Sequence, residues 1–474
     1  MSRRLVTALF VAFFATLLLL PMWIVRYPPL LDYPDHLARS FIVAHLNDPA
    51  YRFRDLYFTE WGPYPYLGMD LSLIALERFL PVETAGRVFL SICVLGIPLA
   101  GWLFLREANP RHEQLSAWIL LLSYQVFFLE GFLNFHFGTV LSLLALTVCL
   151  RYLKSSKPPW LLLMFVLFTI VYFTHLIVFG ITGFIVLVYT LAEPIGWRRR
   201  FWCWAAFVPG VLLYWKSHIV AFNRGDVHFR TLPQKFFAAR AALLHAYSMR
   251  LELVFFWVIV ACVLAAWFRN RQFRWNLPWL IVELALFVLY LILPVSVGPT
   301  WAIDVRLVPM MFVLLLAVAQ VGARQKPLAA VALLIFCISV MNIARNFVRL
   351  QNDIAPMVNA IRTLPRNARM LPIVDLDDSD DMLHRLYMHF WTYAIVERGT
   401  LAPYIFDFRG QTEVRVREEG YVPDAPEEVP PDWEQVRRNY DYVWLWDIDY
   451  AAQLQPYATQ VYHSGRLQLW RMQR

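Results

Sequence analysis

Carboxylate and imidazole side chains that could move a proton lie together directly after the first apolar stretch of the chain. They are Asp32, Asp35 and His36. A carboxylate fixed at the membrane surface could accept the proton of an acceptor hydroxyl, as a general base. It could also hold a divalent cation, Mg²⁺ or Mn²⁺, against a phosphate group. The spacing of these residues favours neither chemistry over the other.

The residues around Asp35 also predict a local structure. Three prolines, Pro28, Pro29 and Pro34, hold the chain extended where it leaves the apolar stretch. Apolar residues then recur at helical spacing over residues 36–46, which predicts an interfacial amphipathic helix. Asp35 could be only the N-cap of that helix, and this is the structural alternative to a chemical role.

A second set of polar side chains lies at the outward ends of later apolar stretches. Ionisable groups at membrane depth are costly, so they need a partner or a purpose. We expect these residues to line one outward-facing cavity with the first three, although the tips of hairpins are polar in any membrane protein. The members of this set are Glu130, Asn134, His136, His175, Lys216, His218, Asp304 and Arg306.

Three cations could bind the phosphate of a lipid substrate. They are Arg306, Lys216 and Arg240, and an arginine offers phosphate oxygens a bidentate fork. Arg306 has a structural alternative, which is to pair with Asp304 or to extend toward lipid headgroups.

No metal site is predicted with certainty from the remaining residues. The segment 375–381 contains Asp-x-Asp spacings, but an acidic loop before a helix is the commoner reading. His384 and His389 are five residues apart and do not share a helical face. All five cysteines lie inside apolar stretches, so neither a disulfide framework nor a thiolate metal site is expected.

The composition identifies the environment in which these residues act. Of the 474 residues, 59% are hydrophobic and only 16% are charged, which excludes an ordinary soluble enzyme. Residues 1–350 carry a net charge of +14 and residues 351–474 a net charge of −6. The basic residues lie between apolar stretches and not on one soluble face, so nucleic acid is excluded as a partner.

Apolar stretches long enough to span a membrane predict a polytopic α-helical protein. If the clusters of Lys and Arg between them are cytoplasmic, the long stretch 160–191 must cross twice and turn near residues 174–180. This gives about eleven transmembrane helices, with the N-terminus in the cytoplasm and a retained first span instead of a cleaved signal peptide. The stretches begin at Leu5, Ala85, Leu115, Phe137, Trp160, Phe201, Glu252, Leu277, Val305 and Pro327.

Two domains are expected. Residues 1–350 form the transmembrane domain, with a large first outer loop at 26–84 and a second at 216–251. Residues 351–474 form a small extracytoplasmic α/β domain, with strands expected at 370–374, 442–446 and 467–471.

This arrangement resembles the GT-C superfamily of polytopic membrane glycosyltransferases, in a bacterial subgroup. The features that carry the resemblance follow one another along the chain. A single first span leads into a long outer loop with an acidic residue near its start, and many short hairpins and an outer C-terminal domain follow. The segments 62–71 and 131–138 are also similar to those of bacterial multi-span proteins in this group. The family motif falls on Asp35 or Asp32, and we favour Asp35 because His36 can support it.

The resemblance implies an enzyme of the bacterial inner membrane that acts on its extracytoplasmic face. Its donor would be a polyprenyl-phosphate-linked sugar, and its acceptor an envelope lipid, glycan or protein. Membrane lipids would surround it, no cofactor beyond the possible divalent cation is implied, and the C-terminal domain would be periplasmic or extracellular. The alternatives are a polysaccharide polymerase or ligase, or a non-catalytic transporter or assembly subunit of envelope glycan biosynthesis.

Overall fold

The computed structural model describes residues 3–217, 226–245, 247–269, 276–298, 300–321, 325–375, 387–417 and 429–473. By its internal contacts the chain divides into two units. The first unit contains Met1–Ile24 and Leu90–Asn346, and the second contains Val25–Phe89 and Phe347–Arg474. The divisions fall inside two long helices, α4 (Val82–Ala108) and α15 (Gln325–Thr363).

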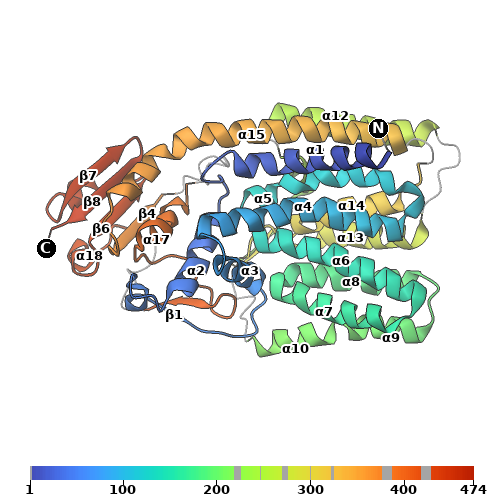
Figure 1. Cartoon of the computed structure of the whole chain (residues 1–474), viewed down its shortest axis with the longest axis horizontal. Coiled ribbons are helices and arrows are strands. Elements are labelled where there is room, and N and C mark those ends of the chain that lie inside the picture. Colours follow the sequence, from blue (N-terminus) through green and yellow to red (C-terminus); the bar gives the residue numbers. More distant parts are fainter. Residues whose placement is uncertain are drawn as a thin grey trace. The chain divides into compact units, whose positions relative to one another are not determined.

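The first unit is helical apart from two short strands (Figure 1). Its other helices are α1 (Arg3–Trp23), α5 (Val126–Leu129), α6 (Leu133–Ser155), α7 (Pro158–Thr174), α8 (Leu176–Ala192), α9 (Trp197–Ala205), α10 (Val208–Lys216), α11 (Leu232–Leu244), α12 (Met249–Arg269), α13 (Leu277–Ile292) and α14 (Val308–Val318). It also contains the 3₁₀ helices η2 (Pro110–Tyr124) and η3 (Val305–Leu307), and the strands β2 (Val227–His228) and β3 (Ser296–Val297).

Helices of the first unit have the length and composition of membrane spans. Within the described residues, α4, α6 and α15 are long and apolar enough to cross a bilayer, and several apolar helices are shorter. In addition, α11 and the first part of α12 form a pair bent by 95°. The polytopic helical class is therefore confirmed, while the number of eleven spans stays a prediction.

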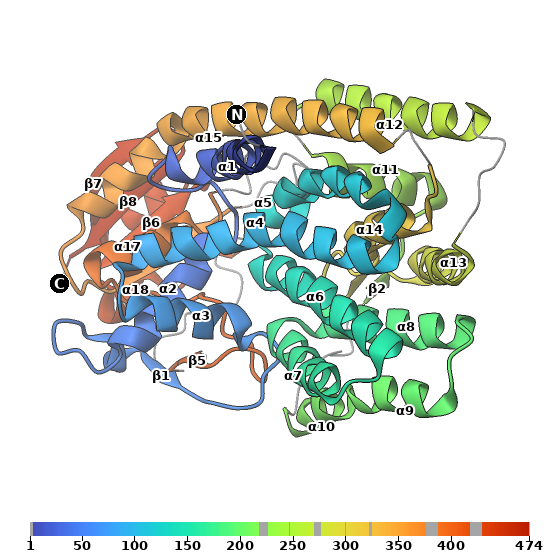
Figure 2. The ribbon, with the colours of Figure 1, turned by 45° about the vertical axis from the view of Figure 1, so that its right-hand side comes forward.

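The long apolar stretch 160–191 is divided as the charge pattern predicts. His175 has an extended backbone, ends α7 and begins α8. The two helices pack against each other and against α6 (Figure 2). Two other expected spans are interrupted. The stretch from Leu115 lies in η2, and the stretch from Phe201 breaks after Ala205, because a proline in the first turn of α10 starts a new helix.

The second unit combines helices with small sheets. Its elements are α2 (Tyr33–His45), η1 (Phe53–Asp55), β1 (Tyr57–Thr59), α3 (Leu67–Glu77), β4 (Met370–Val374), η5 (Phe390–Thr392), α17 (Tyr393–Arg398), β5 (Val414–Val416), α18 (Trp433–Asn439), β6 (Tyr442–Trp446), α19 (Ala451–Leu454), β7 (Ala458–Ser464) and β8 (Leu467–Met472). The main sheet has the order β4-β6-β8-β7, with β4 and β6 parallel and the other pairs antiparallel. The three expected strands are confirmed as β4, β6 and β8.

A second ladder joins two distant parts of the sequence within this unit. Strand β1 pairs antiparallel with β5, with Phe58 opposite Arg415. Residues 25–89 therefore form one compact unit with residues 347–474. This differs from the expected boundary at residue 350, because α15 continues to Thr363 and the first loop packs with the C-terminal residues. The second expected loop, 216–251, also contains a helix, α11.

The helix that follows the first span differs from the expected one. It begins at Tyr33, so Asp35 lies in its first turn and Asp32 takes the N-cap position. Proline at residue 34 fits this first turn, where a backbone N–H has no helical partner. Residues 33–42 are all buried. The interfacial amphipathic helix was therefore the wrong prediction, because α3, α17 and η5 cover α2.

Candidate functional site

Asp35 lies in the interior of the second unit. None of its surface is exposed. Its two carboxylate oxygens accept the backbone N–H of Phe406, with N–O distances of 3.1 and 3.3 Å. The carboxylate is thus held from one side by its own helix and from the other by the irregular chain that precedes β5.

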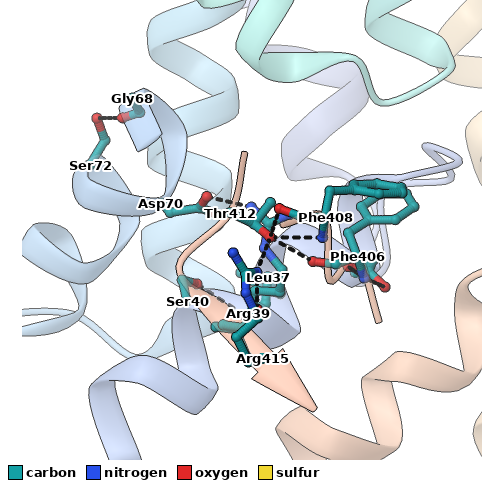
Figure 3. A network of polar contacts seen from close by, with 12 residues as sticks. Leu37, Arg39, Ser40, Gly68, Asp70, Ser72, Phe406, Phe408, Thr412 and Arg415 are labelled. Carbon is teal, nitrogen blue, oxygen red and sulfur yellow. Dashed lines mark hydrogen bonds and ion pairs between the residues drawn. The ribbon is translucent and has the colours of Figure 1, made fainter. Parts of the chain in front are cut away.

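A buried ion pair lies in the same unit, and Figure 3 labels both of its residues. Arg39, one helical turn further along α2, donates to the carboxylate of Asp70 on α3. Both of these side chains are 1% exposed. Glu413 is fully buried as well, and its negative charge acts on Arg39 together with those of Asp70 and Asp35. The charges of three carboxyl groups therefore act on the single guanidinium of Arg39. Three buried carboxylates exceed one positive charge, so protonation or further cations must balance the excess negative charge.

Burial changes the acidity of the Asp35 carboxyl group. It raises the pKa of Asp35 to about 7, although Arg39 and the Phe406 amide act in the opposite direction. A carboxyl group that titrates near neutral pH can accept and release a proton under physiological conditions, which is the property required of a general base.

The two other residues of the predicted catalytic group have different surroundings. The ring of His36 packs edge-on against Phe406, with 5.6 Å between the ring centroids. Burial lowers the pKa of His36 well below its ordinary value, so the ring is neutral. Asp32 lies 3.6 Å from the Nε2 atom of His389, and burial lowers the pKa of that histidine to about 4.

In the first unit, Asp304 is the partner of two cations. Its carboxylate accepts from Arg230 at 2.5 Å and from the Lys235 ammonium at 3.0 Å. Asp304 is fully buried and Lys235 is 2% exposed. The pairing of Asp304 with Arg306, which was the structural alternative for Arg306, is therefore wrong, because Arg230 and Lys235 occupy this carboxylate. One negative charge is shared between two positive ones, so the cluster has a net positive charge.

Arg306 instead contacts a histidine and aromatic rings. Its guanidinium lies 3.0 Å from the Nε2 atom of His175 and 3.1 Å from the carbonyl oxygen of Trp301. A guanidinium can only donate, so Nε2 must accept and the His175 ring carries its proton on Nδ1. The guanidinium also lies 5.0 Å from the ring centroid of Phe132. The structure thus brings together two of the predicted residues, His175 and Arg306.

The other predicted substrate-binding residues are spread over several elements of the first unit. Asn134 and His136 are buried in the first turn of α6, and the His136 ring lies 3.3 Å from the carbonyl oxygen of Cys93. Lys216 is exposed at the end of α10. Arg240, on α11, stacks on Phe237 with 4.3 Å to the ring centroid. His218, and residues 376–386 with His384 and most of the acidic segment, lie outside the described residues.

Sequence reasoning missed five charged residues that complete these clusters. They are Arg39, Asp70, Arg230, Lys235 and Glu413. Asp70 lies within the segment 62–71 that carries part of the family resemblance, but nothing in its spacing indicated burial. Arg39 could have been found by its position four residues after Asp35, which places both on one helical face.

The predicted divalent cation would need a group of oxygen or nitrogen ligands. Within the described ranges, no group of three or more His, Cys, Asp or Glu side chains is arranged to hold a metal ion. The buried carboxylates of the second unit face Arg39 and the Phe406 amide. A divalent cation held by Asp35 or Asp32 stays a prediction.

The fold and the apolar helices define a multi-pass helical membrane protein with a small C-terminal sheet. Two solved structures share this fold. The structure of ArnT from Cupriavidus metallidurans in the apo state aligns with a TM-score of 0.52 and 15% identity, over 98% of this chain and 97% of that one. The arabinofuranosyltransferase AftD from mycobacteria aligns with a TM-score of 0.51 and 13% identity, over 100% of this chain and 40% of that one.

No protein-family model matches the sequence, and no curated protein matches it. At these identities the likeness concerns the fold alone. The fold that this chain shares with ArnT and AftD agrees with the polytopic helical fold that the sequence predicts.

Proposed function

We propose that this protein is a membrane glycosyltransferase that moves a sugar from a polyprenyl-phosphate carrier to an envelope acceptor. The single observation that carries the proposal is the likeness to ArnT, which extends over nearly the whole of both chains. The arabinofuranosyltransferase AftD shares the same fold and by its name transfers a sugar. The acceptor is an envelope lipid, glycan or protein.

Asp35 is the general base in this proposal. The acceptor hydroxyl oxygen forms a bond to the anomeric carbon of the donor sugar, and the bond from that carbon to the carrier phosphate breaks. The proton of the hydroxyl passes to the Asp35 carboxylate, and the phosphate leaves with the bonding electron pair. The pKa of Asp35, raised to about 7 by burial, supports this role, because such a carboxylate is a stronger base than an exposed one.

Arg306 is proposed to bind the carrier phosphate, with Lys216 and Arg240 as further contacts. Two observations support Arg306. Arg306 is 9% exposed as a whole residue, and its guanidinium donates to the His175 ring and to the carbonyl oxygen of Trp301. The neighbouring cluster of Arg230, Lys235 and Asp304 adds a net positive charge. A phosphate monoester is already an anion when it leaves, so nearby cations assist it more than an acid would.

The proposed location is the bacterial inner membrane. The clusters of Lys and Arg between the apolar stretches support a cytoplasmic N-terminus and an outer position for residues 351–474, by the positive-inside rule. Reaction at the extracytoplasmic face would use a carrier presented from within the bilayer, so no nucleotide-sugar site is required.

The test uses the full-length protein in nanodiscs with a panel of polyprenyl-phosphate sugars. Released polyprenyl phosphate is measured by mass spectrometry for the wild type, for Asp35→Asn and for the control Asp55→Asn, which changes an exposed aspartate of the same unit. Turnover that is lost only in Asp35→Asn is the expected result. Turnover that survives this change would move the base to Asp32 or elsewhere. No turnover with any carrier would reject the transferase and favour a transport or assembly role.

A further inference from the structure

The proposed base has no exposed surface, and its carboxylate is contacted by a segment of its own unit, residues 402–413, which we call the strap. The strap has no regular secondary structure and connects Leu401 to β5. The amide of Phe406, near its middle, donates to both oxygens of Asp35. A carboxylate with no exposed surface cannot reach an acceptor hydroxyl while this contact is closed.

Both ends of the strap are fixed. At one end, the hydroxyl of Tyr57 donates to the Ala402 carbonyl at 2.7 Å and accepts its amide at 2.9 Å. At the other end, β5 is paired with β1. Movement is thus confined to the residues between these two anchors.

Two residues of the strap have positive φ angles. Tyr404 has φ of 65° and Gly410 has φ of 77°. Glycine adopts this left-handed region freely, but tyrosine is strained there and is held only by its surroundings. The strained position lies two residues before Phe406, so a small change at Tyr404 moves the amide that covers Asp35.

The middle of the strap is held by the aromatic contacts of Phe406, by the buried side chain of Ile405 and by the ion pair of Asp407 with Arg415. The Phe406 ring packs against the rings of His36 and His389, with centroid distances of 5.6 and 4.8 Å. It also stacks on Phe408, which is 45% exposed. An aromatic side chain that is half in solvent adds little to the stability of the closed position.

One hydroxyl ties the strap into its closed shape (Figure 3). The Oγ1 atom of Thr412 accepts the Phe408 amide at 3.1 Å and lies 3.2 Å from the Phe406 carbonyl oxygen, to which it donates. Arg415 then donates to the same hydroxyl oxygen at 3.2 Å and to Asp407 at 2.9 Å. Thr412 is therefore the residue on which the contacts within the strap converge.

We infer that the strap is a lid over Asp35, which must lift for catalysis, and that Thr412 is the positioning residue that sets its closed state. The inference rests on the proposed function of Asp35 as base. It adds that the acceptor reaches Asp35 only after the Phe406 amide has left the carboxylate. The strap also excludes water from the carboxylate while no acceptor is bound, which protects the donor sugar from hydrolysis.

Chemical labelling of carboxyl groups tests the lid without any need for turnover. The full-length protein in nanodiscs is treated with a water-soluble carbodiimide and glycine ethyl ester, and the labelling rates of Asp35 and the exposed Asp449 are measured by mass spectrometry. We expect Asp35 to react at least about tenfold more slowly than Asp449, because it reacts only from the open state. Labelling of Asp35 as fast as that of Asp449 would overturn the inference.

The variant Thr412→Val removes the central hydroxyl and keeps the side-chain shape. Its matched control is Thr400→Val, because Thr400 is fully buried in the same unit and its hydroxyl has no hydrogen-bond partner in the part of the chain that the structure describes. We expect the Asp35 labelling rate to rise several-fold in Thr412→Val, and to stay unchanged in Thr400→Val. Equal rates in Thr412→Val and the wild type would overturn the inference.

Hydrogen exchange of the wild type keeps the test decisive if Thr412→Val fails to fold. The Phe406 amide should exchange at least about tenfold faster than the amides of residues 39–42 in α2, which open only with the whole unit. Equal protection of the two sets would overturn the inference. If Asp35 is labelled at the expected slow rate but no carrier is turned over, the lid is supported and the transferase is rejected. If a carrier is turned over but Asp35 is labelled as fast as Asp449, the transferase is supported and the lid is rejected.

Discussion

Arg39 of α2 and Asp70 of α3 form an ion pair from which solvent is almost entirely excluded, since each side chain is 1% exposed. Breaking such a pair on one side leaves an uncompensated charge in the interior. We expect Asp70→Asn to destabilise the second unit by about 3–5 kcal/mol, measured by thermal or denaturant unfolding in detergent. The double change Arg39→Met with Asp70→Leu should cost less than Asp70→Asn alone.

The control for this prediction is Asp55→Asn. Asp55 pairs with Arg52 in a surface contact, where the side chains are 36% and 61% exposed. Surface pairs contribute about 0–1 kcal/mol, so the control should stay close to the wild type. A loss of the same size in both variants would contradict a special role for the buried pair.

Asp35 should make the stability of the second unit depend on pH. Its pKa in the folded protein, about 7, lies above the value of 3.8 for an exposed aspartate. The contribution of the Asp35 carboxyl group to the free energy of unfolding is therefore fully present below pH 4. It is lost as the pH rises toward and through 7. Denaturant unfolding between pH 5 and 8 should show this decline in the wild type. Asp35→Asn has no titrating group at this position, and a curve that declines as steeply as that of the wild type would contradict the assignment.

Arg306→Gln should weaken use of the lipid-phosphate donor. A hydrogen bond to a charged group contributes about 1.5–3 kcal/mol, which corresponds to a loss of about 10- to 100-fold in kcat/KM for the carrier. The readout is the carrier-release assay across donor concentrations. Arg106→Gln is the matched control, because Arg106 is half exposed and lies 3.6 Å from Glu113. An unchanged kcat/KM in Arg306→Gln would show that the phosphate binds elsewhere.

A methyl group at Gly86 should disturb the helix that carries Asp35. A Cβ atom at this position of α4 would come 2.1 Å from the Tyr33 hydroxyl oxygen and 2.9 Å from Leu37. Tyr33 is 1% exposed and has little room to move, so Gly86→Ala should destabilise the protein by about 1–3 kcal/mol. Thermal unfolding is the measurement.

The control is Gly180→Ala, since no atom lies within 4 Å of a Cβ built at Gly180. Alanine there should be neutral or stabilise α8 by up to about 1 kcal/mol, because glycine is a poor helix former. A Gly86→Ala variant as stable as Gly180→Ala would mean that Tyr33 moves aside without loss.

The parts of the fold that depend on local patterns could be predicted from the sequence. The apolar strands β4 and β6 have the expected bounds, and the break at His175 followed from the positions of the neighbouring basic residues. Both features depend on local composition and on the positive-inside rule. These two features can therefore be predicted without knowing which distant residues pack against them.

The surroundings of Asp35 could not be predicted in the same way. Its amide donor, Phe406, is 371 residues away in the sequence. The helical spacing of residues 36–46 is the same whether the polar face of α2 meets water or a second layer of protein. The wrong prediction of an interfacial helix arose from this ambiguity. Asp304 shows the same limit, because the short spacing to Arg306 suggested a pair that Arg230 and Lys235 make instead.

The division of the second unit between the two ends of the sequence has a consequence for synthesis. The ribosome makes residues 25–89 first and must then make residues 90–346 before the remainder of this unit exists. At typical rates of translation the interval is about 10 to 50 seconds. During that time α2 and α3 have neither β5 nor the Phe406 amide to cover them. Until residues 347–474 have been made, the buried acidic residue Asp35 of α2 lacks its partner, the Phe406 amide, and each new chain must avoid misassembly at this place.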